Sequence, residues 1–168
     1  QKCPAIETSM LDKGFAEFAP WRVVSGGAAE CSFMTRNSSV NLGFNHMVTA
    51  SAEGAVTAMA DMRQAVAGTS LVEPMPSLGE QGFTYQSKTT NGQVNRTSMF
   101  FYGHRGRVNV SGYLNLKDAI TPAQRDLAAN LIAGTLGVAT SPKALAKATN
   151  CRYLDPTLVD RLLPAGDV

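Results

Sequence analysis

The chain has 168 residues, 44% of them apolar, and a formal net charge of +2 from 15 Lys and Arg against 13 Asp and Glu. This length and apolar content suit a single domain spanning residues 1–168 around one continuous core. The charge excess is too small to attract nucleic acid or an acidic membrane at long range, and the most apolar tract is too interrupted to span a membrane.

The N-terminal end predicts export. The sequence begins at Gln1 without an initiator Met, as a mature bacterial chain does after its signal peptide has been removed. The charged fraction is low, at 17%, and the cysteines suit an oxidising compartment. We therefore expect a periplasmic or secreted protein.

The three cysteines allow one disulfide and leave one thiol over. A bond between Cys3 and Cys31 would close the N-terminal arm against the first long strand. A bond to Cys151 would instead attach the C-terminal tail, and three reduced thiols remain an alternative. Spacing alone does not fix the pairing, and we predict Cys3 with Cys31.

The first half of the chain predicts strands followed by a helix. Alternating apolar residues between turn signals indicate strands over 21–24, 30–35 and 40–48. Apolar residues then recur at helical spacing at Val56, Met59, Met62 and Val66. Ser51 can cap this helix and Gly68 can end it, so we predict a helix over Ala52–Ala67.

The second half predicts the same order of elements. Strands are expected over 83–87, 94–102 and 107–116, with hairpin turns at Asn91-Gly92 and over residues 103–106. Thr121 and Gln124 form a capping box for a helix over Ala123–Leu136. Ser141-Pro142 and Asp155-Pro156 open two further short helices, so residues 138–168 are expected to form a helical tail.

The two halves, about 21–68 and 82–137, suggest an internal duplication. Phe33, Val40, Asn41 and Leu42 match residues of the same or similar type 68 positions later: Phe101, Val108, Asn109 and Val110. Two strand-strand-helix units side by side would form an antiparallel sheet with both helices on one face. The predicted fold class is therefore α+β, a two-layer sandwich with a C-terminal helical tail.

Three segments also carry a family resemblance. They are an N-terminal arm with Cys3 and a short helix, a strand with Cys31-Ser32-Phe33, and the loop Met75–Phe83 before the second hairpin. Over Cys3 to Gly137 this combination resembles small extracytoplasmic bacterial domains, often lipoproteins, of the PsbP-like alpha/beta type. The resemblance implies the fold and the compartment, and it supplies no functional residue. The tail with Cys151 departs from the family pattern.

Catalytic and metal-binding patterns are sparse. Hydrolytic triads need a histidine beside a nucleophile, and only His46 and His104 are present, with no G-x-S-x-G sequence. The cysteines and histidines lack the close spacings of zinc sites, so no metal and no cofactor are expected. Arg96, His104, Arg105 and Arg107 gather around the second hairpin in the sequence, where they could hold a carboxylate or phosphate.

Three functions follow as hypotheses. The first is an exported, non-enzymatic binding or accessory module that recognises a protein partner or small ligand of the cell envelope. It predicts an aromatic patch on the open sheet face, with Phe100, Tyr102 and Tyr113 as candidates. The alternative is a secreted hydrolase-type enzyme that uses His46 or His104. A small-ligand or metal sensor would need a methionine-lined cavity between sheet and helices.

Overall fold

A computed structural model describes residues 2–27, 29–79, 81–91 and 94–140. The α-helices are α1 (Thr8–Gly14), α2 (Ala52–Ala67) and α3 (Pro122–Ala139), and two short 3-10 helices are η1 (Ala16–Phe18) and η2 (Pro76–Leu78). The strands are β1 (Trp21–Gly26), β2 (Glu30–Thr35), β3 (Asn41–Val48), β4 (Val72–Pro74), β5 (Phe83–Asn91), β6 (Val94–Arg105) and β7 (Val108–Leu116). The helices predicted beyond Ser141, and Cys151, lie outside the described residues.

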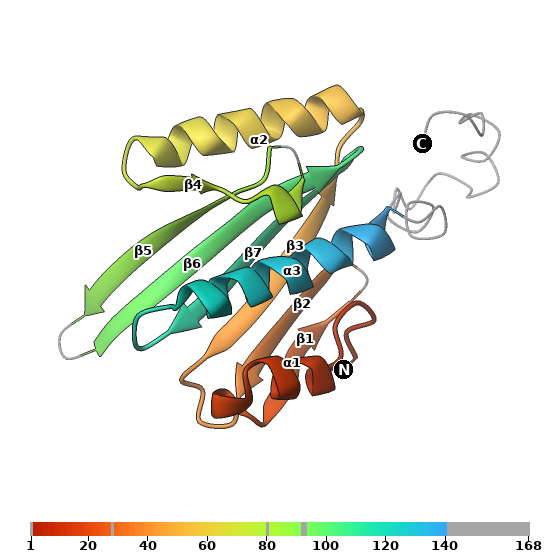
Figure 1. The fold of residues 1–168 in the computed structure, drawn as a ribbon. Coiled ribbons are helices and arrows are strands. Elements are labelled where there is room, and N and C mark those ends of the chain that lie inside the picture. The colour runs from red at the N-terminus through yellow and green to blue at the C-terminus, as the bar shows by residue number, and fades with distance from the viewer. Residues whose placement is uncertain (1, 28, 80, 92–93, 141–168) are drawn as a thin grey trace.

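The strands form one antiparallel sheet of seven strands, in the order β1-β2-β3-β7-β6-β5-β4 (Figure 1). β1, β2 and β3 pair in chain order in one half of the sheet, and β4, β5, β6 and β7 pair in chain order in the other half. The two series join in the middle, where β3 pairs with β7 along its whole length. The predicted α+β class is confirmed, with three helices packed against the sheet.

The first face of the sheet carries the main hydrophobic core. Side chains alternate between faces along a strand, so Leu42, Phe101 and Leu114 point to the same side, where all three are fully buried. α3 covers them, as Figure 1 shows in front of the sheet. A Cβ added at Gly112 of β7 would lie 2.5 Å from Cδ1 of Ile132, so this glycine lets α3 approach the sheet closely.

The helix ends follow the predicted capping chemistry. The Thr121 hydroxyl accepts from the Gln124 amide, and the Gln124 side chain accepts from the Thr121 amide, which completes the capping box of α3. At the start of α2 the Ser51 hydroxyl accepts from the Gly54 amide. Both caps satisfy backbone donors that a helix N-terminus leaves unpaired, so both helix starts were readable from local sequence.

The prediction that both helices lie on one face is wrong. Phe83 pairs with Tyr102, and both point away from the face that holds Phe101. Phe83 is nevertheless fully buried, and it lies outside the main core together with Ala55 and Met59, the buried residues of α2. α2 contacts β6 and β7, so it covers the end of the second face, opposite α3. The first face there is already occupied by η2 and α3.

The second hairpin also differs from the prediction. β6 continues through His104 and Arg105, and the turn is Gly106-Arg107, with Gly106 at φ 53°. A positive φ favours glycine, so Gly106 rather than Gly103 is the turn residue. Gly103 has a different role, because a Cβ there would collide with the backbone carbonyl of Leu78 in η2. The short strand β4 was not predicted, since three residues are too few for a periodic signal.

The Cys3–Cys31 disulfide is confirmed, with its Cα atoms 5.9 Å apart. It ties the N-terminal arm to β2 beside the main core, where Cys31 is 2% exposed. A structural disulfide is typical of proteins from oxidising compartments. No helix in the described part of the chain is long and apolar enough to cross a membrane.

Candidate functional site

Among the described residues, no helix covers the second face of the sheet beyond α2, and this face carries most of the tyrosines. Strand alternation brings Tyr85 of β5, Phe100 and Tyr102 of β6, and Tyr113 of β7 to this face, each partly exposed. The sequence has 4 tyrosines, and three of them lie here. The predicted patch residues Phe100, Tyr102 and Tyr113 are thus brought together, and Tyr85 joins them.

The rings on β5 and β6 stack across the strands. The ring centroids of Tyr85 and Phe100 are 4.9 Å apart with planes 20° from parallel, and those of Phe83 and Tyr102 are 5.1 Å apart at 16°. These separations match the spacing of neighbouring strands, about 4.8 Å, so the rings stack in the direction that runs across the sheet. The outer ring faces of Phe100 and Tyr102 therefore point toward β7.

Tyr113 lies flat against its cross-strand partner, Gly43. A Cβ added at Gly43 would lie 2.6 Å from the Tyr113 hydroxyl oxygen and 2.7 Å from its Cζ. Gly43 is paired directly with Tyr113 in the β3–β7 register, so the absence of a side chain provides the space for the ring. The ring forms the floor beside the upright rings of Phe100 and Tyr102.

A cavity of about 380 Å³ opens over these residues. Its aromatic lining is Phe44, Phe100, Tyr102 and Tyr113, and polar groups come from Ser25, Ser32, Asn45, Ser111 and Glu30. We call this cavity the tyrosine groove. Its volume falls within the range of small-molecule sites, about 300–1,000 Å³, and a mixed aromatic and hydroxyl lining is usual for such sites.

Burial shifts the acidity of two tyrosines of the groove. Burial raises the pKa of Tyr102 to about 12, with further contributions from the nearby Tyr85 charge and hydroxyl. Burial also raises the pKa of Tyr113 above its ordinary value of 10.0. Both hydroxyls therefore remain protonated at neutral pH and can donate or accept hydrogen bonds toward a ligand.

Alkaline pH is expected to weaken the fold through Tyr102. Its folded pKa lies above the unfolded value of 10.0, so its contribution to stability is complete below that pH and is lost as pH rises toward about 12. Urea unfolding measured from about pH 9 to about pH 12 should show a falling free energy of unfolding, with a shallower fall in Tyr102→Phe. Equal slopes in both proteins would contradict this assignment.

In the described part of the chain, neither histidine is seen beside a nucleophile that a substrate could reach. His46 lies on the first face, where its Nε2 is 2.8 Å from the Thr135 hydroxyl oxygen. That hydroxyl donates to the Ile132 carbonyl, so His46 Nε2 is the donor to it, and Thr135 is too buried to meet a substrate. His104 lies on the opposite face, with both ring nitrogens buried. Neither residue lines the tyrosine groove.

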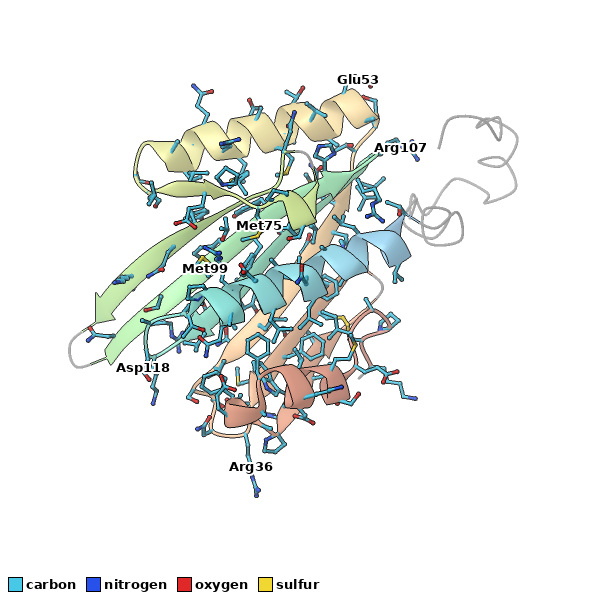
Figure 2. All side chains as sticks on the ribbon, in the orientation of Figure 1. Arg36, Glu53, Met75, Met99, Arg107 and Asp118 are labelled. Atoms are coloured by element: carbon cyan, nitrogen blue, oxygen red, sulfur yellow. A yellow bond between two sulfur atoms is a disulfide. The ribbon has the colours of Figure 1, made fainter. Side chains whose placement is uncertain are left out.

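The predicted basic cluster is not one site. Arg105 and Arg107 flank the β6–β7 turn, and Figure 2 shows Arg107 at the end of that hairpin. Arg96 pairs with Thr89 near the opposite end of β6, about 30 Å from Arg105 along an extended strand. His104 belongs to β6 and has both ring nitrogens buried, so it does not lie in a solvated turn. The reason is strand length: β6 is 12 residues long, so its ends are far apart.

Two core methionines and a second cavity lie outside the tyrosine groove. Met75 and Met99, labelled in Figure 2, are 8% and 6% exposed and belong to the main core. A smaller cavity of about 180 Å³ lies between β4, β5 and the start of α3. Beside it Arg125 forms an ion pair of 2.9 Å with Glu73. Within the described residues no cluster of three or more His, Cys, Asp or Glu could hold a metal.

Comparison with known proteins finds distant structural similarity. No family model and no curated protein matches the chain. A crystal structure from Bacteroides thetaiotaomicron VPI-5482 is similar, with a TM-score of 0.46 and 10% sequence identity. The match covers 67% of this chain and 40% of that one, so this chain spans well under half of its length. The comparisons therefore assign neither a family nor an activity.

Proposed function

We propose that this protein is an exported, non-enzymatic binding module whose ligand or partner enters the tyrosine groove. The observation that carries the proposal is the aromatic wall and floor made by Phe100, Tyr102 and Tyr113 beside exposed hydroxyl and amide groups. Large aromatic side chains left partly exposed on one sheet face are typical of recognition surfaces. The disulfide supports a periplasmic or secreted location.

The hydrolase alternative receives less support from the geometry. An acyl-transfer site needs a nucleophile within hydrogen-bond reach of a histidine that a substrate can approach. The Thr135 hydroxyl beside His46 is fully buried, and both ring nitrogens of His104 are buried. None of the described residues that line the groove is a histidine, so binding is the function that its chemistry favours.

A duplication of two strand-strand-helix units remains part of the proposal. Phe33 and Phe101 are fully buried on the same face, and the two series of strands meet at β3 and β7. The helices do not repeat this arrangement, because α2 and α3 cover opposite faces. The proposed duplication therefore concerns the strands, and the PsbP-like resemblance stays an expectation beside it.

Amide chemical shifts test the binding proposal. We would titrate the ¹⁵N-labelled protein separately with phenol, methyl β-glucoside and choline chloride, and follow Asn45, Ser111 and Tyr113. At least one probe is expected to shift these amides selectively. The proposal fails if all three probes leave the groove unchanged or bind only at the cavity beside Arg125.

Two serine variants provide the matched control. Ser111 lines the groove, whereas Ser98 lies on the same face outside it. Ser111→Tyr should weaken probe binding at least about tenfold by filling the groove, and Ser98→Tyr should change it less than about twofold. Equal effects of the two substitutions would place the binding site elsewhere.

A further inference from the structure

The charged group that lines the tyrosine groove is acidic. Glu30 is the only Asp, Glu, Lys, Arg or His among the described residues that line it. Alternation along β2 turns Glu30 to the same face as Ser32, and its register partner is Asn45, which also lines the groove. Arg22 lies further along this face, where its guanidinium contacts Met34 Sδ outside the groove. The lining therefore disfavours anions and favours positive charge.

The aromatic rings add to this preference. The outer ring faces of Phe100 and Tyr102 point across the sheet toward β7, and Tyr113 lies flat over Gly43. The face of an aromatic ring carries partial negative charge, which attracts a cation within about 6 Å of the ring centroid. The ring faces of Phe100 and Tyr102, the ring of Tyr113 and the Glu30 carboxylate therefore surround one space.

The polar groups of the groove limit which cations fit. The Ser25 and Ser32 hydroxyls bond to each other at 2.8 Å, so each has less capacity for a ligand. An alkylated ammonium group has few or no N–H donors and is weakly hydrated, so it loses little on entering a site whose lining is partly aromatic. A cavity of about 380 Å³ is large enough for a small organic molecule but sits at the low end for such sites.

We propose that the tyrosine groove binds a small organic cation with an alkylated ammonium group, held against the rings of Phe100, Tyr102 and Tyr113 and facing Glu30. This assignment rests on the proposed binding function and adds the chemical class of the ligand. A neutral sugar or an uncharged aromatic ligand is the competing outcome that the experiment separates.

The test compares two probes of the same shape. Choline carries a trimethylammonium group, and 3,3-dimethylbutan-1-ol replaces the charged nitrogen by carbon. Amide shifts of Asn45, Ser111 and Tyr113 should report binding of choline about tenfold tighter than its neutral analogue. Glu30→Gln should weaken choline binding about threefold at low salt and leave the neutral analogue unchanged.

The control for charge is Asp118→Asn, which removes one carboxylate in the loop before α3. Figure 2 shows Asp118 at the opposite end of the sheet from Arg107. The substitution should leave choline affinity unchanged. Equal binding of choline and its neutral analogue, or tighter binding of methyl β-glucoside, would overturn the cation assignment while leaving the groove as a binding site. No groove shift with any probe would overturn both the assignment and the proposed function.

Discussion

Phe101→Ala should lower the free energy of unfolding by about 3–5 kcal/mol, whereas Phe100→Ala should lower it by only about 1 kcal/mol. The two residues are adjacent in β6 but point to opposite faces. Phe101 is fully buried in the main core, so its removal leaves a cavity. Phe100 is partly exposed at the tyrosine groove, so its truncation removes less buried surface.

Urea unfolding of both variants, followed by circular dichroism, checks this pair. The difference between the two losses of unfolding free energy shows which face of the sheet forms the core, because both variants remove a phenylalanine ring from β6. A cost for Phe100→Ala equal to that for Phe101→Ala would mean that the second face is also packed. An open groove on that face would then be untenable.

Loss of the Cys3–Cys31 bond should also cost about 3–4 kcal/mol, as estimated from the loop-closure entropy of a 28-residue separation. The bond holds the N-terminal arm against β2, and both sulfur-bearing residues are buried with Ile6 and Leu11 in the main core. The unfolded chain gains the most freedom when this loop opens, so the unfolded state is stabilised.

The measurement compares oxidised wild type with the double variant Cys3→Ala and Cys31→Ala in guanidinium chloride. Reductant should lower the midpoint of wild type toward that of the variant and leave the variant itself unchanged. If oxidised wild type and the double variant unfold at the same guanidinium chloride concentration, the disulfide does not stabilise the native fold.

Local signals explain how much of the fold could be predicted from the sequence. The caps at Ser51 and Thr121 and the apolar spacing of α2 depend on neighbouring residues, so both helix starts were predicted to within a residue. The hairpin between β5 and β6 followed from Asn91-Gly92 in the same way. The Cys3–Cys31 disulfide was predicted among several possible pairings, and the structure confirms it.

Non-local packing explains what the sequence did not reveal. The face chosen by α2 depends on η2, which fills the space over Gly103 on the first face through Leu78. Nothing in the periodicity of Val56 and Met59 distinguishes one face of the sheet from the other. Likewise, Arg96 is near His104 in sequence, but a continuous strand separates them.

Part of the candidate site was predicted from the sequence. Phe100, Tyr102 and Tyr113 were predicted because alternate aromatic residues in strands tend to share a face. Glu30, which lines the groove, and Tyr85, which stacks on Phe100 outside it, were missed, since they reach this face through the pairing of β2 with β3 and of β5 with β6. The alternation of Phe83 and Tyr85 was a signal that could have been used. The role of Gly43 needed the β3–β7 register, which links residues 70 positions apart.

A crystal structure of the protein grown with choline chloride tests the central claim most directly. We expect a trimethylammonium group in the tyrosine groove, within about 6 Å of the ring centroids of at least two of Phe100, Tyr102 and Tyr113. Choline bound only outside this groove, or a groove closed by repacked rings, would contradict the claim that this face is the binding site.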